Sequence, residues 1–273
     1  MGLLDGKVAV VTGAGRGIGE AIALTLVREG AACMINDVDG EPAEAVLKQC
    51  EEMGGRAAVS LGSVAERAFT DAMMAAAVER FGGLDILVNN AGVTKDRVVH
   101  KMSDEEWDLV IDVNLKGTFN CIRSAAPYMR DAAKQEIKAT GDVSHHRKIV
   151  NLYSTAAIRG NPGQINYTAA KMGNVGITRT VAQEWAAFKI NVNAVGPGFT
   201  DTRMTKSKEE MAALGYENMG IPAEQRDAVI ARIPFKRAGT PQDIANAVLF
   251  FVSPLSDYVT GQEINVSGGF QIP

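Results

Sequence analysis

The chain has 273 residues, of which 46% are hydrophobic and 22% are charged, and it carries a net charge of -4. This length suits one large α/β domain or two small ones, and the acidic balance does not suggest a surface for nucleic acid or anionic membranes. No apolar run reaches the ~18 residues of a membrane-spanning helix, and Met1–Lys7 lacks the pattern of a secretory signal. We therefore expect a cytoplasmic protein in which Cys33, Cys50 and Cys121 are buried free thiols.

Short runs rich in Val and Ile alternate with longer segments of helical periodicity. Strands are predicted at Val8–Val11, Ala32–Ile35, Ala57–Leu61, Ile86–Val88, Ile149–Leu152, Ile190–Val195 and Glu263–Val266. Helices are predicted near 18–29, 41–53, 65–81, 104–130, 167–186 and 241–252. Strands without polar alternation are typical of a sheet buried on both faces, and the βαβα rhythm predicts a parallel sheet between two helical layers. Because no linker interrupts this rhythm, residues 1–273 are predicted to form a single domain.

The first predicted strand leads into a glycine-rich turn and then into a helix. The turn reads Thr12-Gly13-Ala14-Gly15-Arg16-Gly17-Ile18-Gly19. Glycines let the backbone approach a pyrophosphate, whose charge suits the N-terminus of a helix. The spacing differs from the G-x-G-x-x-G fingerprint, but its place after the first strand of a βαβ unit favours a dinucleotide site.

Asp37 ends the second predicted strand, eighteen residues after Gly19. A carboxylate at this place accepts both hydroxyls of the adenosine ribose and repels a 2′-phosphate, which favours NAD. Two observations keep NADP as the alternative. Asp37 is also a turn-forming residue beside Asp39 and Gly40, and the guanidinium of Arg16 is able to hold a 2′-phosphate.

Asn89-Asn90-Ala91-Gly92 follows the fourth predicted strand. Polar side chains at the carboxyl edge of a parallel sheet lie where such folds bind ligands. Ordinary capping of a loop explains the same residues equally well.

Tyr167 and Lys171 are four residues apart and therefore share one face of a predicted helix. A phenol ionises near pH ~10, and a nearby ammonium brings its pKa toward the range in which general acid–base catalysis is efficient. Ser154, thirteen residues before Tyr167, offers a neutral donor for a carbonyl oxygen. Tyr and Lys at this spacing also occur on many solvated helices, so the pair gains weight only from the rest of the chain.

With the glycine loop, the Asn-Asn-Ala-Gly stretch and Ser154, Tyr167 and Lys171 in this order, the chain resembles the short-chain dehydrogenase/reductase family, most closely its 3-oxoacyl-thioester reductase branch. The resemblance extends over almost the whole chain, through Pro197-Gly198 to Thr260-Gly261-Gln262 and Gly268-Gly269. It implies a doubly wound, Rossmann-type sheet of seven parallel strands, a nicotinamide cofactor, and a homotetramer formed through the long helices and the last strand.

The resemblance also implies a catalytic tetrad of Asn114, Ser154, Tyr167 and Lys171. Tyr167 would exchange a proton with the substrate oxygen, which Ser154 would orient. Lys171 would bind the nicotinamide ribose and lower the pKa of Tyr167, and Asn114 would hold a water that links Lys171 to solvent. Beyond the glycine loop, Asp37, Tyr167 and Lys171, the implied cofactor contacts are Ser63, Val64, Asn90, Ala91, Gly92, Pro197, Gly198, Thr200 and Thr202.

Four features depart from or elaborate the family pattern. Ser63 stands where an aspartate is usual beside the adenine, and Tyr153 stands where a small serine is common, so its ring either packs in the core or lines the pocket. Residues 131–147 are a polar insertion, predicted to be an exposed loop away from the chemistry, and its His145-His146 pair is not expected to bind a metal. Residues 198–225 are predicted to form a substrate lid.

These inferences favour an NAD(H)-dependent oxidoreductase that interconverts a secondary alcohol and a ketone on a small molecule or a thioester. An acyl carrier protein would need a basic docking surface, and Trp185–Phe188 offers little positive charge, which favours a CoA thioester or a free alcohol. One alternative is an NADP(H)-dependent biosynthetic 3-oxoacyl reductase. Another is a nucleotide-binding scaffold or regulator without turnover. No metal, nucleic-acid or membrane partner is expected.

Overall fold

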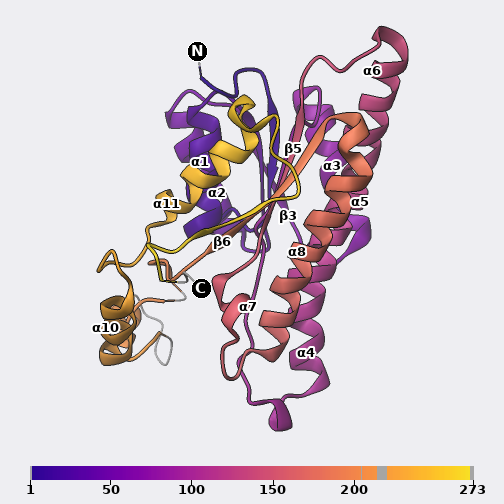
Figure 1. Cartoon of the computed structure of the whole chain (residues 1–273). Coiled ribbons are helices and arrows are strands. Elements are labelled where there is room, and N and C mark those ends of the chain that lie inside the picture. The colour runs from indigo at the N-terminus through magenta and orange to yellow at the C-terminus, as the bar shows by residue number, and fades with distance from the viewer. Residues whose placement is uncertain (1, 204, 214–219, 271–273) are drawn as a thin grey trace.

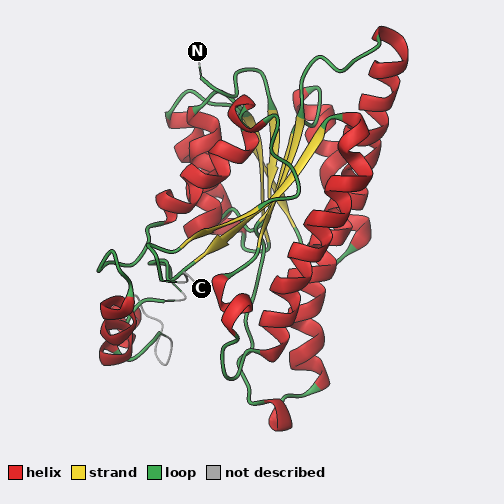
Figure 2. Ribbon diagram, viewed as in Figure 1, coloured by secondary structure: helices red, strands yellow, loops and turns green. Residues whose placement is uncertain are grey.

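A single sheet of seven parallel strands organises the chain (Figures 1 and 2). The computed structural model describes residues 2–203, 205–213 and 220–270. The strand order is β3-β2-β1-β4-β5-β6-β7, so the direction of winding reverses between β1 and β4. The strands are β1 (Val8–Val11), β2 (Ala32–Asp37), β3 (Ala57–Leu61), β4 (Ile86–Asn89), β5 (Arg147–Leu152), β6 (Ile190–Pro197) and β7 (Glu263–Val266). The predicted doubly wound α/β fold is confirmed.

Helices cover both faces of this sheet, which explains why its strands are apolar without alternation. Along β1, Ala9 and Val11 pack into the core on one face and Val10 packs into the core on the other. The first face carries α1 (Gly17–Arg28), α2 (Gly40–Glu52) and α11 (Pro241–Val252), and the second carries α3 (Arg67–Phe81), α5 (Gly117–Ala126) and α8 (Ile165–Trp185) (Figure 1). The three cysteines lie in these two cores as free buried thiols, as predicted.

One long helical stretch runs from Asp104 to Thr140 on the second face. It consists of α4 (Asp104–Ile111), a π-helical turn (Asp112–Lys116), α5, a second π-helical turn (Pro127–Asp131) and α6 (Ala132–Thr140). The prediction that residues 131–147 form a loop was therefore wrong for its first part. The α6 residues are good helix formers but mostly polar, because α6 projects beyond the sheet and has little core to face (Figure 1). The helix ends at Gly141, whose φ of 89° is left-handed.

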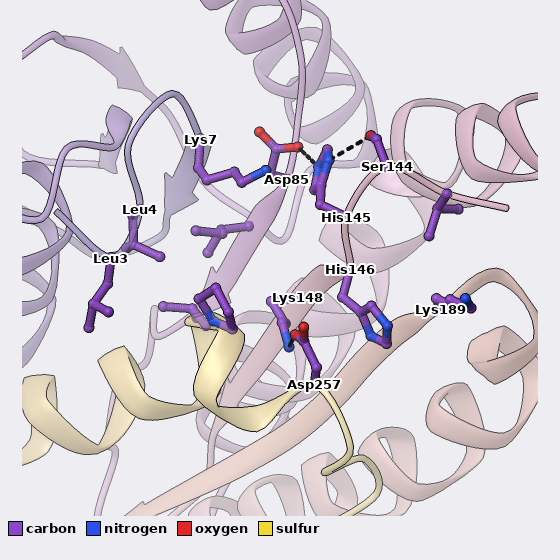
Figure 3. A pocket seen from close by; sticks show the side chains of 14 residues that line it. Leu3, Leu4, Lys7, Asp85, Ser144, His145, His146, Lys148, Lys189 and Asp257 are labelled. Atoms are coloured by element: carbon purple, nitrogen blue, oxygen red, sulfur yellow. Dashed lines mark hydrogen bonds and ion pairs between the residues drawn. The ribbon is translucent and has the colours of Figure 1, made fainter. Parts of the chain in front are cut away.

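The segment after α6 is tied to the amino end of the sheet by its two histidines (Figure 3). His145 Nε2 lies 2.5 Å from Asp85 Oδ1, and its Nδ1 lies 3.0 Å from Ser144 Oγ. His146 Nδ1 lies 2.8 Å from Asn191 Oδ1. These are structural hydrogen bonds, and no cluster of metal-binding side chains is found among the described residues. The segment lies at the end of the sheet opposite the carboxyl edge, as predicted.

A cavity of about 240 Å³ opens beside this segment (Figure 3). Lys7, Asp85 and His145 contribute to its wall, and across it the buried Lys148 donates to Asp257 Oδ1 at 2.6 Å. Its basic groups are thus offset by carboxylates. Within the described residues, no helix is long and apolar enough to cross a bilayer.

We predict that Asp85→Asn destabilises the fold. Burial acts to raise the pKa of Asp85, but hydrogen bonds from His145 and from the Val8 N–H outweigh it and hold the pKa below its ordinary value. Asp85 therefore stabilises the fold above its unfolded pKa of ~3.9, and this contribution is lost as pH falls through the lower folded value. Urea denaturation at neutral pH should show a loss of about 1–3 kcal/mol in the free energy of unfolding.

The matched control is Asp142→Asn, because Asp142 pairs with Lys189 on an exposed surface. Its substitution should leave the free energy of unfolding close to that of the wild type. Equal stabilities of the Asp85→Asn variant and the wild type at neutral pH, or a difference that does not shrink in acid, would contradict this account of Asp85.

Candidate active site

The glycine-rich turn and the end of β4 meet at the carboxyl edge of the sheet, between β1 and β4, where the winding reverses and such folds bind ligands. Asn90 Nδ2 donates to the carbonyls of Thr12 and Gly13 at 2.9 Å. Thr12 Oγ1 accepts from the backbone N–H groups of Asn90 and Ala91 at 3.0 Å. Thr12 and Asn90 thus hold two predicted cofactor-binding segments together, and Thr12 was not among the predicted site residues.

The glycines in this turn are required by close packing. A Cβ added at Gly19 would lie 2.0 Å from the Gly13 carbonyl oxygen, and one at Gly13 would lie 2.8 Å from the Ala91 Cα. Gly17 begins α1 with a φ of 58°. The result is a bare backbone cradle at the N-terminus of a twelve-residue helix, with Ile18 in its first turn. This cradle fits the pyrophosphate of a dinucleotide.

Asp37 closes the cradle from the end of β2. Its Oδ2 accepts from the Gly15 N–H at 2.9 Å and its Oδ1 accepts from the Val38 N–H at 2.8 Å. Asp37 is therefore a turn residue and also a carboxylate beside the glycine loop. Arg16 forms an ion pair with Asp39, which places a second carboxylate beside the only guanidinium of the loop.

Ser63 and Val64 follow β3 at the same edge. Ser63 Oγ accepts from the Ala65 N–H at 3.3 Å, so the hydroxyl caps a local turn. Val64 is buried, and its carbonyl accepts from Asn120 Nδ2 at 3.0 Å. These bonds anchor the loop expected beside the adenine.

Lys171 is the centre of the predicted catalytic group. Its side chain is buried, and Nζ donates to the Leu152 carbonyl at 3.1 Å. The same nitrogen lies 5.8 Å from the centre of the Tyr167 ring, and Tyr167 is hydrogen-bonded to Ser154. Ser154 also caps α7 (Thr155–Arg159), accepting from the Ala156 N–H at 3.2 Å. The structure thus brings Ser154, Tyr167 and Lys171 together.

The charges in this group differ from the prediction. Burial lowers the pKa of Lys171 to about 8. Burial also raises the pKa of Tyr167 above its ordinary value; the Ser154 hydrogen bond lowers it only in part, and Asp96 raises it further. The net shift of the Tyr167 pKa is therefore upward, because desolvation disfavours the phenolate. That Lys171 lowers this pKa stays a prediction.

Asn114 joins this group through the π-helical turn at Asp112–Lys116. Its Nδ2 donates to the carbonyls of Val93 and Val110 at 2.9 Å, while its Oδ1 is buried without a partner in the described structure. A Cβ added at Gly92 would lie 2.6 Å from this Oδ1 and 3.3 Å from Lys171 Nζ. The free oxygen thus opens into the space beside Lys171, and π-helical turns are frequent at functional sites.

Asn174, which was not predicted, connects the tetrad elements. Its Nδ2 donates to the carbonyl of Asn114 at 3.1 Å and to that of Leu152 at 3.3 Å. A signal existed in the sequence, because Asn174 lies one turn after Lys171 on the same helix face. Tyr153 packs in the core, which was one of the two alternatives predicted for it. Its ring covers Gly196, and its hydroxyl donates to Asn265 Oδ1 at 2.7 Å.

The segment after β6 lies along the same edge. The Gly198 N–H donates to the Val266 carbonyl at 2.9 Å, and the Pro197 carbonyl accepts from Thr155 Oγ1. Thr200 is buried, and the Thr202 methyl lies 3.6 Å from a Cβ position at Gly17, next to the cradle. The predicted lid, 198–225, contains α9 (Lys208–Ala213) and the start of α10 (Ala223–Arg232). Residues 204 and 214–219 of this lid lie outside the described residues.

Known proteins of similar sequence and structure agree with this geometry. A family model described as enoyl-(acyl carrier protein) reductase matches residues 13–271. The 3-oxoacyl-[acyl-carrier-protein] reductase FabG of Thermotoga maritima is 39% identical over 98% of this chain and 99% of its own. The reductase of the same name from Staphylococcus aureus is 41% identical over 96% and 97%. A crystal structure from Sinorhizobium meliloti, of a protein named as a short-chain alcohol dehydrogenase, superposes with a TM-score of 0.85 at 34% identity, covering 98% and 97% of the two chains.

The Rossmann-type sheet, the glycine cradle and the Ser-Tyr-Lys cluster define a nicotinamide-dependent oxidoreductase that interconverts alcohols and ketones. The chain belongs to the short-chain dehydrogenase/reductase family.

We predict that Gly92→Ala disables the site while leaving the fold intact. The added methyl would collide with Asn114 Oδ1 and crowd Lys171 Nζ, so oxidoreductase turnover should fall at least about tenfold, whereas overpacking should cost only about 1–3 kcal/mol of stability. The matched control is Gly83→Ala, because a Cβ at Gly83 meets nothing within 4 Å. Unchanged turnover of the Gly92→Ala variant would show that the reaction does not depend on the space between Gly92, Asn114 Oδ1 and Lys171 Nζ.

Proposed function

We propose that the chain is an NAD(H)-dependent reductase or dehydrogenase whose substrate is a 3-oxoacyl or 3-hydroxyacyl thioester. The observation that supports it most is the convergence of Ser154, Tyr167 and Lys171 beside the glycine cradle. The thioester is suggested by the names of the FabG relatives at 39% and 41% identity. The protein acts as a single domain in the cytoplasm.

In this proposal each residue of the tetrad has one task. Tyr167 Oη gives its proton to the substrate oxygen or takes it back, and Ser154 Oγ donates a hydrogen bond that orients that oxygen. Lys171 uses one N–H for the Leu152 carbonyl and keeps two for the ribose hydroxyls of the cofactor. The free Oδ1 of Asn114 accepts from a water that connects Lys171 to solvent.

The ionisation of Tyr167 is coupled to the cofactor. Because burial raises its pKa, Tyr167 holds its proton in the isolated chain. A nicotinamide cofactor would supply the hydride and, when oxidised, a positive ring that would favour the phenolate. Tyr167 would then release its proton more readily beside the oxidised cofactor.

The preference for NAD rests on the two carboxylates at the adenosine end of the cradle. Asp37 presents a carboxylate at the end of β2, and Asp39 pairs with Arg16, the residue that would otherwise serve a 2′-phosphate. NADP remains the alternative, because the Arg16–Asp39 pair is partly exposed and can separate.

A homotetramer is part of the proposal. Large apolar side chains are exposed along the two helical stretches expected at one interface, namely Trp107, Phe119, Ile165 and Met172. Ile264 is exposed on β7, the last strand, where the second interface is expected, and Phe250 is exposed on α11. Association of copies would remove these side chains from water.

We predict that Tyr167→Phe abolishes turnover and spares cofactor binding. Loss of the phenolic proton removes general acid–base catalysis, so kcat should fall about 10²- to 10⁴-fold. The assay follows NADH oxidation with a 3-oxoacyl thioester, and NADH binding is measured by fluorescence. Turnover undiminished by the substitution would refute the role of Tyr167. Tight NADH binding by a wild type that reduces no carbonyl would favour the scaffold alternative.

We predict that Asp37→Ala narrows the preference for NADH over NADPH. Removal of the carboxylate eliminates the ribose contact and the repulsion of a 2′-phosphate, and the ratio of kcat/KM for the two cofactors should fall about tenfold or more. Asp39→Ala should raise kcat/KM for NADPH by releasing Arg16, with little effect on NADH. A wild type that already prefers NADPH would contradict the assignment.

A further inference from the structure

Two arginines from helices that are far apart in the sequence lie near one aromatic ring. Arg159 is the last residue of α7, and Arg232 is the last residue of α10. The guanidinium carbon of Arg159 lies 5.2 Å from the centre of the Phe270 ring, and that of Arg232 lies 5.6 Å from it. Both arginines are exposed. Two cations that share a ring lie within about 11 Å of each other, close enough for one multivalent anion to contact both.

Two connections along the chain link this arginine pair to the proposed active site. Arg159 lies five residues after Ser154, so the two residues are separated by about 8 Å of helical rise. On the other side, a Cβ added at Gly198 would lie 2.7 Å from the Ser267 Cβ, which places the chain leading to Phe270 against the predicted cofactor segment.

The charge of the two guanidiniums is not offset by a nearby carboxylate. Within the described residues, no carboxylate lies within ion-pair distance of Arg159 or Arg232, whereas the exposed Arg179 and Arg237 pair with Glu263 and Asp243. A guanidinium is always charged and offers several N–H donors. The site therefore presents two neighbouring cations to a ligand.

A phosphorylated ligand suits this arrangement. Guanidinium groups bind phosphate oxygens through paired hydrogen bonds, and an uncharged alcohol would gain nothing from them. An acyl group on a phosphopantetheine arm carries its phosphate away from the reacting carbonyl, and Arg159 lies at the end of α7 that is remote from Ser154. The arm also provides an apolar and amide surface to lie along the Phe270 ring.

We propose that Arg159 and Arg232 bind the phosphate groups of a coenzyme A thioester and thereby select this substrate. The proposal rests on the proposed reductase function, and it adds two specificity residues outside the tetrad. Phe270 holds the two guanidiniums in place and is a positioning residue.

The experiment compares two substrates that share the acyl group and the thioester, of which only one carries phosphate groups. The rate of NADH oxidation is measured with acetoacetyl-CoA and with the neutral acetoacetyl thioester of N-acetylcysteamine, for the wild type, Arg159→Gln, Arg232→Gln and the double variant. Each single substitution should raise KM for acetoacetyl-CoA about tenfold and leave kcat unchanged, because a charge-assisted contact formed equally in the ground and transition states is lost. The neutral thioester should show no change.

A control variant and a binding measurement complete the test. Arg80→Gln removes an exposed arginine at the end of α3 and should leave both substrates unaffected. Titration calorimetry with coenzyme A itself should show binding by the wild type and an affinity about tenfold lower in the Arg159→Gln and Arg232→Gln variants. The affinity of the wild type should also fall at high salt. A wild type that binds no coenzyme A, or variants that lose activity equally on both thioesters, would overturn the proposal.

Two further outcomes separate the proposal from neighbouring ones. If the wild type binds coenzyme A through these arginines but reduces neither thioester, the proposed reaction fails and the arginine site stands. If the arginines matter only for a thioester presented on an acyl carrier protein, and not for acetoacetyl-CoA, the assignment to coenzyme A is wrong.

Discussion

The proposed catalytic edge of this protein is built around a buried ammonium group whose direct partner, in the part of the chain that the structure describes, is a carbonyl and not a carboxylate. Lys171 is 4% exposed, and its Nζ donates to the Leu152 carbonyl. Burial lowers its pKa to about 8, which means that keeping it charged at pH 7 costs about 3 kcal/mol of stability. The surrounding structure offsets this cost: Asn174 links the Leu152 and Asn114 carbonyls, and the apolar sheet core holds α8 in place.

Because no carboxylate in the described part of the chain pairs with this ammonium, the site is short of negative charge. Tyr167, beside it, does not fill this role, because burial raises its pKa and disfavours the phenolate. The same imbalance suits a site that receives a ribose, a nicotinamide ring and a carbonyl oxygen. The polar side chains are already in position at the carboxyl edge of the sheet, and the bound ligands would supply the charges that interact with them.

Much of this arrangement was predictable because it depends on local patterns. The predicted ends of the seven strands lie within two residues of the observed ends. Short runs of Val and Ile without polar alternation are typical of strands buried on both faces. The positions of Ser154, Tyr167 and Lys171 followed from order and spacing. The helix at Ala132–Thr140 was missed because its polar residues resemble a loop. The roles of Asn174 and the pair of Arg159 and Arg232 on Phe270 depend on contacts between distant segments, which no local pattern reports.

The central claim is that the proton of Tyr167 is controlled by burial and by the charge of the bound cofactor. The direct test is a spectroscopic pH titration of phenolate absorbance, taken as the difference between the wild type and Tyr167→Phe, with and without NAD⁺. The account predicts a Tyr167 pKa above the ordinary ~10 without nucleotide and a lower pKa once NAD⁺ is bound. A pKa below ~10 in the nucleotide-free protein, or one that NAD⁺ does not change, would contradict it.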